Sequence, residues 1–417
     1  MAVNTNPVKG TRDYLYQEML LRDYVQGVIL DTYRACGFTR IATPALEDIN
    51  LLDKSDGGEN LNLIFKILKR GQKLDLSQPD LTERDIVDAG LRYDLTLPLS
   101  RYYANNRAAL REPFKVIQID KVYRAERPQK GRLREFYQCD IDIIGDKSHN
   151  AEVELIYTTA KALRALGFEG FTVRVNDRRI LHDMILAAGF AEEDVPSVCI
   201  TFDKLDKVGL IGVRDELLQK KFDETIAEHF CAMVGAEGDM LENAARVCKN
   251  ADIVNDLKCV MEQSRALAEG NYQIEYDQSL VRGMGYYTGM VFEIADSRFS
   301  GSIAGGGRYD KMVGKLAGED VPAVGFSIGF ERILEILNSI GFEMPKTRAR
   351  VALLYDREQD DIVAVLRLAE QLRGRQNEVT VIPKGKKLGK QLDALRDEGF
   401  DARMIFGKDA EPAPFQK

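Results

Sequence analysis

The stretch YRAERPQKGRLREFYQCDIDIIG, residues 123–145, concentrates positive charge in a chain whose net charge is -8. Its cations are Arg124, Arg127, Lys130, Arg132 and Arg134. On both sides of this cluster polar and apolar residues alternate with period two, which predicts strands over 114–123 and 136–144. Pro128 and Gly131 are the turn residues between the strands. The sequence therefore predicts an antiparallel hairpin with a cationic tip.

The second predicted strand has two unlike faces, because successive side chains of a strand point to opposite sides. The apolar face is expected to join the core and carries Tyr137, Cys139, Ile141 and Ile143. The other face is expected to line a site and carries Phe136, Gln138, Asp140 and Asp142. A solvated hairpin with ordinary surface charge is the plain alternative. Carboxylates and an amide grouped on one face favour a binding site over that alternative.

The composition is that of an ordinary globular protein of several domains, with 417 residues, 45% of them hydrophobic and 30% charged. No run approaches the roughly 18 apolar residues of a membrane span, and the first residues lack the apolar stretch of a secretory signal. We therefore expect a cytoplasmic protein without membrane association. The cysteines form no CxxC pair and there are 3 histidines, which argues against a zinc site, a disulfide framework or a histidine-centred triad. No metal site is predicted.

An acidic protein can still bind a polyanion if its cations are concentrated where the phosphates lie. Residues 123–145 are one such place, and PKGKKLGK, residues 383–390, is a second. For the second segment an exposed lysine-rich turn is an equally good interpretation.

The predicted elements divide the chain into four segments. A long amphipathic helix over 16–36 opens the first segment. Residues 65–77 are interpreted as a strand hairpin around Gly71. The last segment alternates strands and helices as a small parallel-sheet domain does. The segments are 1–178 with helices and strands, a mostly helical insertion at 179–270, strands again at 271–342, and the small domain at 347–417.

The common phosphate-binding motifs are absent from the sequence. There is no GxxxxGK[ST], and GMGYYTG at 283–289 has the wrong spacing for a dinucleotide fingerprint. The triple glycine of AGGGRYD, residues 304–310, either lets a backbone approach a ligand closely or forms a plain tight turn. GFERILEIL, residues 329–337, predicts a helix with Arg332 in its first turn. A cation there opposes the helix dipole, so its side chain either meets an anion or points to solvent.

Taken together, these segments resemble a known family. Arg124 with Glu126, the glycine-rich strand and the GFER helix resemble the second and third motifs of class II aminoacyl-tRNA synthetases. GFTRIATPALED, residues 37–48, resembles the first motif, which forms the dimer interface in that class. Within the class, five segments are similar to the histidyl-tRNA synthetase family: KGTRD (9–13), LRYDLTLP (91–98), ERPQKGR (126–132), LVRGMGYYTG (280–289) and AGGGRYD (304–310).

The resemblance runs from Lys9 to about Arg403 and implies an α+β fold. That fold is a class II synthetase-like antiparallel sheet flanked by helices, with a helical insertion and a small C-terminal α/β domain. The resemblance makes 1–178 and 271–342 the two parts of the catalytic core. It makes 347–417 an anticodon-binding-like domain that ends earlier than a complete one, after its third strand. The implied assembly is a homodimer.

The resemblance also implies a reaction. The carboxylate of histidine attacks the α-phosphate of Mg-ATP to give histidyl-adenylate and pyrophosphate, and the terminal ribose of histidine tRNA then takes the acyl group. Both first reactants are anions, so the site must offset their repulsion and align them, which is work for arginines and Mg²⁺. The implied cofactors are ATP and the Mg²⁺ that it carries. The implied partners are L-histidine and histidine tRNA.

The resemblance assigns roles to individual residues. The expected catalytic cations are Arg124, Arg282 and Arg332. The expected ATP-binding set is Arg124, Glu126, Arg132, Phe136 and Arg332. The expected histidine-binding set is Asp94, Thr96, Gln138, Asp142, Arg282, Tyr286 and Tyr287. In this set Asp94, Thr96 and Gln138 are expected at the α-ammonium group, and the imidazole nitrogens are expected to meet Asp142 and Tyr287.

Two positions depart from the family pattern. Gly285 stands where the family usually has an acidic residue, and Asp142 stands where the family usually has glutamate. One alternative function is a non-catalytic, histidine-binding regulatory subunit of ATP phosphoribosyltransferase. Such a subunit generally lacks the C-terminal domain and does not need the ATP-binding arginines. The other alternative is a synthetase of the same class for proline or threonine, which would not require the LVRGMGYYTG segment.

Overall fold

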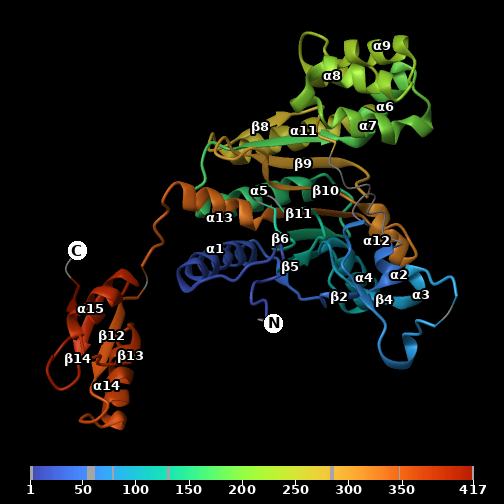
Figure 1. Ribbon diagram of the computed structural model, residues 1–417. Helices are drawn as coiled ribbons and strands as arrows, with labels where there is room; N and C mark the ends of the chain where they lie inside the picture. Colours follow the sequence, from blue (N-terminus) through green and yellow to red (C-terminus); the bar gives the residue numbers. More distant parts are fainter. Residues whose placement is uncertain are drawn as a thin grey trace. The chain divides into compact units, whose positions relative to one another are not determined.

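The computed structural model describes residues 3–53, 62–77, 79–128, 132–281, 286–346 and 348–415. The chain divides into two compact units, residues 1–342 and 343–417. Each unit has its own sheet and its own hydrophobic clusters (Figure 1). The candidate site lies in the first unit.

An eight-stranded sheet forms the centre of the first unit. In spatial order its strands are β1 (Thr39–Arg40), β5 (Phe114–Tyr123), β6 (Glu135–Ile144), β11 (Ala323–Gly329), β10 (Ser302–Arg308), β9 (Met290–Ala295), β7 (Thr172–Asp177) and β8 (Gln273–Tyr276). The six inner strands pair antiparallel, and the predicted hairpin is β5 with β6. The predicted α+β fold is confirmed. The sheet is mixed rather than wholly antiparallel, because the pairs β1–β5 and β7–β8 are parallel and are joined by the long crossovers that parallel strands require.

The alternation along β6 decides what covers each face of the sheet. Cys139, Ile141 and Ile143 are fully buried in the main hydrophobic cluster. The helices that share this cluster and cover this face are α1 (Tyr16–Ala35), α5 (Asn150–Ala165) and α13 (Phe330–Ser339). On the other face Val116 and Ile144 belong to a second cluster with side chains of α4 (Thr96–Asn106) and α12 (Asp310–Ala317). The polar residues of β6 lie on this second face.

The insertion between β7 and β8 is helical throughout. Its helices are α6 (Arg178–Ala188), α7 (Val195–Phe202), α8 (Leu205–Gln219), α9 (Glu224–Val234), α10 (Met240–Ala245) and α11 (Ala251–Ala268). Edge-to-face contacts of Phe230 with Phe190 and Phe202 hold its core together. The last helix, α11, returns to the sheet and packs against α5 and β8 (Figure 1).

Residues 46–91 contribute a separate antiparallel sheet. Its order is β2 (Leu46–Asp48), β4 (Val87–Leu91) and β3 (Lys66–Leu68), with the short helices α2 (Ile49–Asp53) and α3 (Glu83–Ile86). The predicted hairpin around Gly71 is wrong, because β3 pairs with β4 and residues 71–73 form a 3-10 turn. Leu76 belongs to the expected second strand of that hairpin and is 66% exposed, so this segment has no core to pack against.

The second unit is a small α/β sheet. Its strand order is β13 (Glu378–Pro383), β12 (Arg350–Tyr355), β14 (Ala402–Ile405) and β15 (Ala413–Pro414), and its helices are α14 (Ile362–Gly374) and α15 (Leu388–Asp397). The first three strands are parallel, and β15 pairs antiparallel with β14. The prediction that the domain stops after its third strand is therefore wrong, because a two-residue strand ending in a proline carries no periodicity to detect.

None of the helices in the described part of the chain combines the length and the apolar character that a membrane crossing requires.

A buried ion pair joins α5 to the end of β10. Nε and Nη2 of Arg308 each donate to one carboxylate oxygen of Glu152 at 2.7 Å, and the Glu152 side chain is 1% exposed. The pair fixes the strand that carries the triple glycine. Removing Glu152 would leave the buried Arg308 with the longer, more exposed pair to Asp310, at 3.5 Å.

We expect Glu152→Gln to lower the free energy of unfolding by up to about 3–5 kcal/mol, because the buried Arg308 would lose its two-pronged partner and keep the longer, 3.5 Å pair with Asp310. The matched control is Glu154→Gln, two residues along α5. Glu154 pairs with Lys115 near the surface, with side chains 32% and 31% exposed, so its loss should cost about 1 kcal/mol or less. Urea unfolding followed by circular dichroism measures the free energy of unfolding of both variants. Equal losses of stability would contradict the stabilising role given to the Glu152–Arg308 pair.

Candidate active site

A cavity of about 570 Å³ opens over the polar face of β6. Its walls come from the β5–β6 hairpin, from β10 and β11, and from the start of α13. Ten of the twelve predicted site residues line it: Thr96, Arg124, Glu126, Arg132, Phe136, Gln138, Asp142, Tyr286, Tyr287 and Arg332. Asp94 lies beneath the lining and is 1% exposed. Arg282 lies outside the described residues, as does Gly285.

Three arginines line the cavity, and they are here termed the cationic edge: Arg124, Arg132 and Arg332. Arg124 follows the last residue of β5, its Nε donates to the carbonyl of Tyr93 at 2.9 Å, and its guanidinium lies 5.1 Å from the centre of the Phe136 ring. These contacts hold the guanidinium in one orientation at the cavity wall.

Two further contacts complete the cationic edge. Nη1 of Arg332 donates to the backbone carbonyl of Ser302 on β10, and Nη1 of Arg132 lies 3.5 Å from Oε2 of Glu126. Of the two orientations expected for Arg332, the structure has the one that faces the cavity rather than open solvent.

Three buried carboxylates are here termed the carboxylate floor: Asp140 and Asp142, which line the cavity, and Asp94, which does not. They are 1%, 4% and 3% exposed. Oδ2 of Asp94 and Oδ1 of Asp140 are buried without a hydrogen-bond partner, and so is Oε1 of Gln138. Buried acceptors without donors are costly, so the floor is built to receive donors from a ligand.

Burial changes the ionisation of the carboxylate floor. It raises the pKa of Asp94 to about 6, against the lowering effect of the Leu97 and Thr96 amides and the Arg124 charge. Burial raises the pKa of Asp142 to about 7, although the hydrogen bond from Tyr309 lowers it. The pKa of Asp140 rises well above its ordinary range, because burial is reinforced by the charge of Asp142. A cation placed among these groups would favour their ionised forms.

Glycines make room for the side chains of the floor. Gly325 on β11 lies opposite Asp142, and a Cβ there would come within 1.9 Å of the Asp142 Oδ1. Gly307 on β10 leaves space for the Tyr287 ring, which a Cβ would approach to 2.9 Å. The triple glycine is therefore part of a strand that allows close approach, and not a tight turn.

Sequence reasoning missed residues that complete the floor from neighbouring strands. The Tyr309 hydroxyl donates to Asp142 Oδ1 at 2.7 Å. The Ser327 hydroxyl lies 3.2 Å from Nε2 of Gln138, and Ser327 pairs with Asp140 across the ladder. A signal was present in VGFSIG, residues 324–329, where Gly325, Ser327 and Gly329 place small residues on one strand face. Which strand they would face depends on the register, which the sequence does not show.

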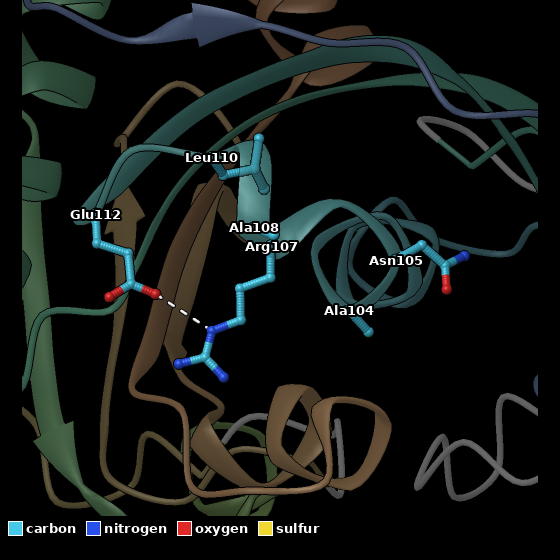
Figure 2. Close-up of a pocket in the computed structure, with 6 residues that line it drawn as sticks. All are labelled: Ala104, Asn105, Arg107, Ala108, Leu110 and Glu112. Carbon is cyan, nitrogen blue, oxygen red and sulfur yellow. Dashed lines mark ion pairs between the residues drawn. The ribbon is translucent and has the colours of Figure 1, made fainter.

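A different hollow of about 680 Å³ lies at the end of α4. Figure 2 shows its six lining residues, with Arg107 Nε 3.5 Å from Glu112 Oε1. It contains none of the predicted site residues. Over the described ranges, no group of three or more histidine, cysteine, aspartate or glutamate side chains is placed to hold a metal ion.

We expect the stability of the protein to fall as the pH rises from about 4 to about 7, in part because of Asp142. Its pKa is about 7 in the folded protein and 3.8 ordinarily, so within this window the folded state binds the proton that the unfolded state has lost. Asp142→Asn should remove up to roughly 4 kcal/mol of this decline. Urea unfolding at several pH values measures it, with Asp320→Asn, at an exposed position, as the control. If the free energy of unfolding depended on pH in the same way in wild type and Asp142→Asn, the raised pKa given to Asp142 would be wrong.

Comparisons with known proteins agree on one family. The family model described as histidyl-tRNA synthetase matches residues 10–333. A "Histidine--tRNA ligase" of Leifsonia xyli subsp. xyli is 40% identical over 416 residues, which cover 96% of this chain and 95% of the relative.

Solved structures give the same result. The crystal structure of histidyl-tRNA synthetase from Nostoc sp. PCC 7120 has a TM-score of 0.77 and 27% identity, and the match covers 96% of this chain and 91% of that one. A Bacillus halodurans protein titled "ATP phosphoribosyltransferase regulatory subunit/histidyl-tRNA synthetase" also has a TM-score of 0.77, covering 97% and 99%. Its 19% identity shows a shared fold alone. The extent of the family match and the identity to the Leifsonia protein show that this chain belongs to the histidyl-tRNA synthetase family.

Proposed function

We propose that this chain activates L-histidine with ATP and transfers the histidyl group to the 3′ end of histidine tRNA. One observation carries the proposal: a single cavity joins the cationic edge to the carboxylate floor. ATP brings phosphates, and histidine brings a carboxylate, an ammonium group and an imidazole. The cationic edge and the carboxylate floor match the charges of these two substrates.

The cationic edge is the proposed ATP end. Arg124 is the residue proposed to contact both the α-phosphate and the histidine carboxylate, and its contacts with Tyr93 and Phe136, which hold its orientation, support this role. Phe136 offers a ring for the adenine to stack on, and Glu126, in the segment that connects β5 to β6, lines the same cavity. Arg332 and Arg132 bring further positive charge toward the phosphates. Mg²⁺ carried with ATP would neutralise part of the phosphate charge.

The carboxylate floor is the proposed histidine end. The orphaned oxygens of Asp94 and Gln138 would accept the N–H groups of the α-ammonium, with Thr96 beside them. Asp142, held by Tyr309, and Tyr287 would contact the imidazole nitrogens. Arg282 and Tyr286 remain predicted histidine contacts. Asp140 brings a second buried carboxylate next to the shorter Asp142 side chain, which offers compensation for the missing methylene.

The chemistry proposed for these residues is alignment and charge stabilisation rather than proton transfer. Holding the carboxylate in line with the α-phosphate turns an encounter of two anions into a step within one complex. Specificity follows from the buried polar groups, because an analogue lacking the imidazole nitrogens would leave them unpaired. Such sites reject analogues by about 10⁴-fold or more.

The second unit is the proposed anticodon-binding domain. Lys386 and Lys387 are exposed in the segment between β13 and α15, and Lys390 is exposed in the first turn of α15, where they offer positive charge to an RNA backbone. Binding of histidine tRNA, homodimer formation and a cytoplasmic location stay predictions. The regulatory-subunit alternative gains no support from the cavity, because Arg124 and Arg332 both line it and a subunit that only binds histidine does not need them.

We expect histidine-dependent exchange of pyrophosphate into ATP by the purified protein, with no exchange for the other amino acids. Arg124→Ala should lower kcat/KM about a hundredfold, since one preorganised charge contact is lost. The control is Arg111→Ala, at an exposed position outside the cavity, which should retain wild-type rates. Histidine binding without any exchange would favour the regulatory-subunit alternative, and exchange with proline or threonine instead would favour a different synthetase.

The kcat/KM for histidine should rise as the pH increases through about 6 to 7, because the free protein must ionise Asp94 and Asp142 before they can accept donors. In Asp142→Asn the part of this rise in kcat/KM that lies near pH 7 should disappear. Titration of free histidine is common to both proteins and cancels in the comparison. If kcat/KM rose near pH 7 in the variant as it does in the wild type, the role given to Asp142 would be wrong.

A further inference from the structure

The residues that precede α1 contact the ATP end of the cavity from outside. Residues 9–14, here termed the strap, include the KGTRD segment. Thr11 N donates to Val8 O at 2.9 Å, and Gly10 has φ +90°, so the chain makes a tight turn with a positive φ at its third residue. This is the position where such turns favour glycine.

The turn of the strap is seated against the hairpin. The Arg134 amide donates to the Gly10 carbonyl at 2.8 Å, and Arg134 Nη1 donates to the Lys9 carbonyl at 3.2 Å. A Cβ at Gly10 would lie 2.7 Å from Pro128 Cγ and 2.8 Å from Arg134 Cγ. Contacts below 3.0 Å require the neighbours to move. Glycine is thus favoured at position 10 for two reasons, which are the positive φ and the closeness of the hairpin side chains.

Arg134 connects the strap to the residues proposed to bind ATP. Its carbonyl accepts from the Arg124 amide at 2.9 Å, and its Nε donates to the Glu126 carbonyl at 3.0 Å. The same residue therefore contacts the strap on one side and the backbone of both Arg124 and Glu126 on the other. A shift of Arg134 would move these two residues with it.

The other end of the strap reaches the start of α13. The Arg22 guanidinium lies 3.9 Å from the centre of the Tyr14 ring. Arg22 also forms a two-pronged ion pair with Glu331, at 2.6 and 2.8 Å, with a side chain only 7% exposed. Glu331 directly precedes Arg332. The strap thus contacts the hairpin side of the cationic edge directly and is connected to its α13 side through Arg22 of α1.

We infer that the strap is a positioning element for the ATP end, and that Gly10 is the residue that seats it. The inference rests on the proposed function in so far as this end of the cavity takes ATP. No residue of the strap lines the cavity, so it acts through Arg134 and Arg22 rather than by touching the substrates. A displacement of about 1 Å in such supports can cost about a hundredfold in rate.

The test compares Gly10→Ala with Gly167→Ala. Gly167 has nearly the same backbone strain, φ +83°, but a Cβ there would meet nothing within 4 Å. Both variants should lose similar stability from strain. Only Gly10→Ala should lower kcat/KM for ATP, by about tenfold or more, while the KM for histidine changes less than about threefold. Amides of residues 123–127 and 132–136 should also exchange hydrogen faster in Gly10→Ala alone.

Equal ATP kinetics and equal hydrogen exchange in the two variants would overturn the inference. If Gly10→Ala did not fold, Arg134→Met would take its place, because it keeps the aliphatic stem but removes the donors to Lys9 and Glu126. Wild-type behaviour of Arg134→Met would equally overturn the inference. Absence of histidine-dependent exchange in the wild type would contradict the proposed function instead, and the hydrogen-exchange comparison would still decide the role of the strap.

Discussion

The site depends on one physical constraint, which is the burial of three carboxylates with too few donors around them. Asp94, Asp140 and Asp142 lie within a few per cent of complete burial, and the pKa of each is raised. A fold keeps such groups only when a bound partner compensates for their desolvation. We propose that the ammonium and imidazole groups of histidine supply the missing donors, and that the carboxylate floor is the origin of specificity.

The rest of the catalytic unit can be understood as support for this floor. β6 carries an apolar face that anchors it to the main core, and this fixes the direction of the polar face. Gly325 and Gly307 on the neighbouring strands leave space for Asp142 and Tyr287, and the buried pair of Glu152 with Arg308 holds the end of β10. The cationic edge then lies at the end of the hairpin, next to the floor and in the same cavity.

The sequence predicted what local patterns determine and missed what depends on contacts between distant segments. The period-two alternation around residues 114–144 predicted β5, β6 and the division of β6 into a core face and a site face. The roles of Tyr309 and Ser327 could not be found, because they depend on which strands become neighbours. The hairpin at 65–77 failed for the same reason, since β3 takes a partner about twenty residues away. The grouping of the site residues came from the resemblance to the family, and alternation alone would not have found it.

The most direct test of the account is calorimetric binding of two analogues of histidine. Histidinol keeps the ammonium and imidazole groups but has no carboxylate, whereas imidazole lactate keeps the carboxylate and has a hydroxyl in place of the ammonium. If the carboxylate floor determines recognition, histidinol should bind within about tenfold of histidine and imidazole lactate roughly a hundredfold more weakly, because a buried charge would lose its partner. Equal binding of imidazole lactate and histidine would contradict the account.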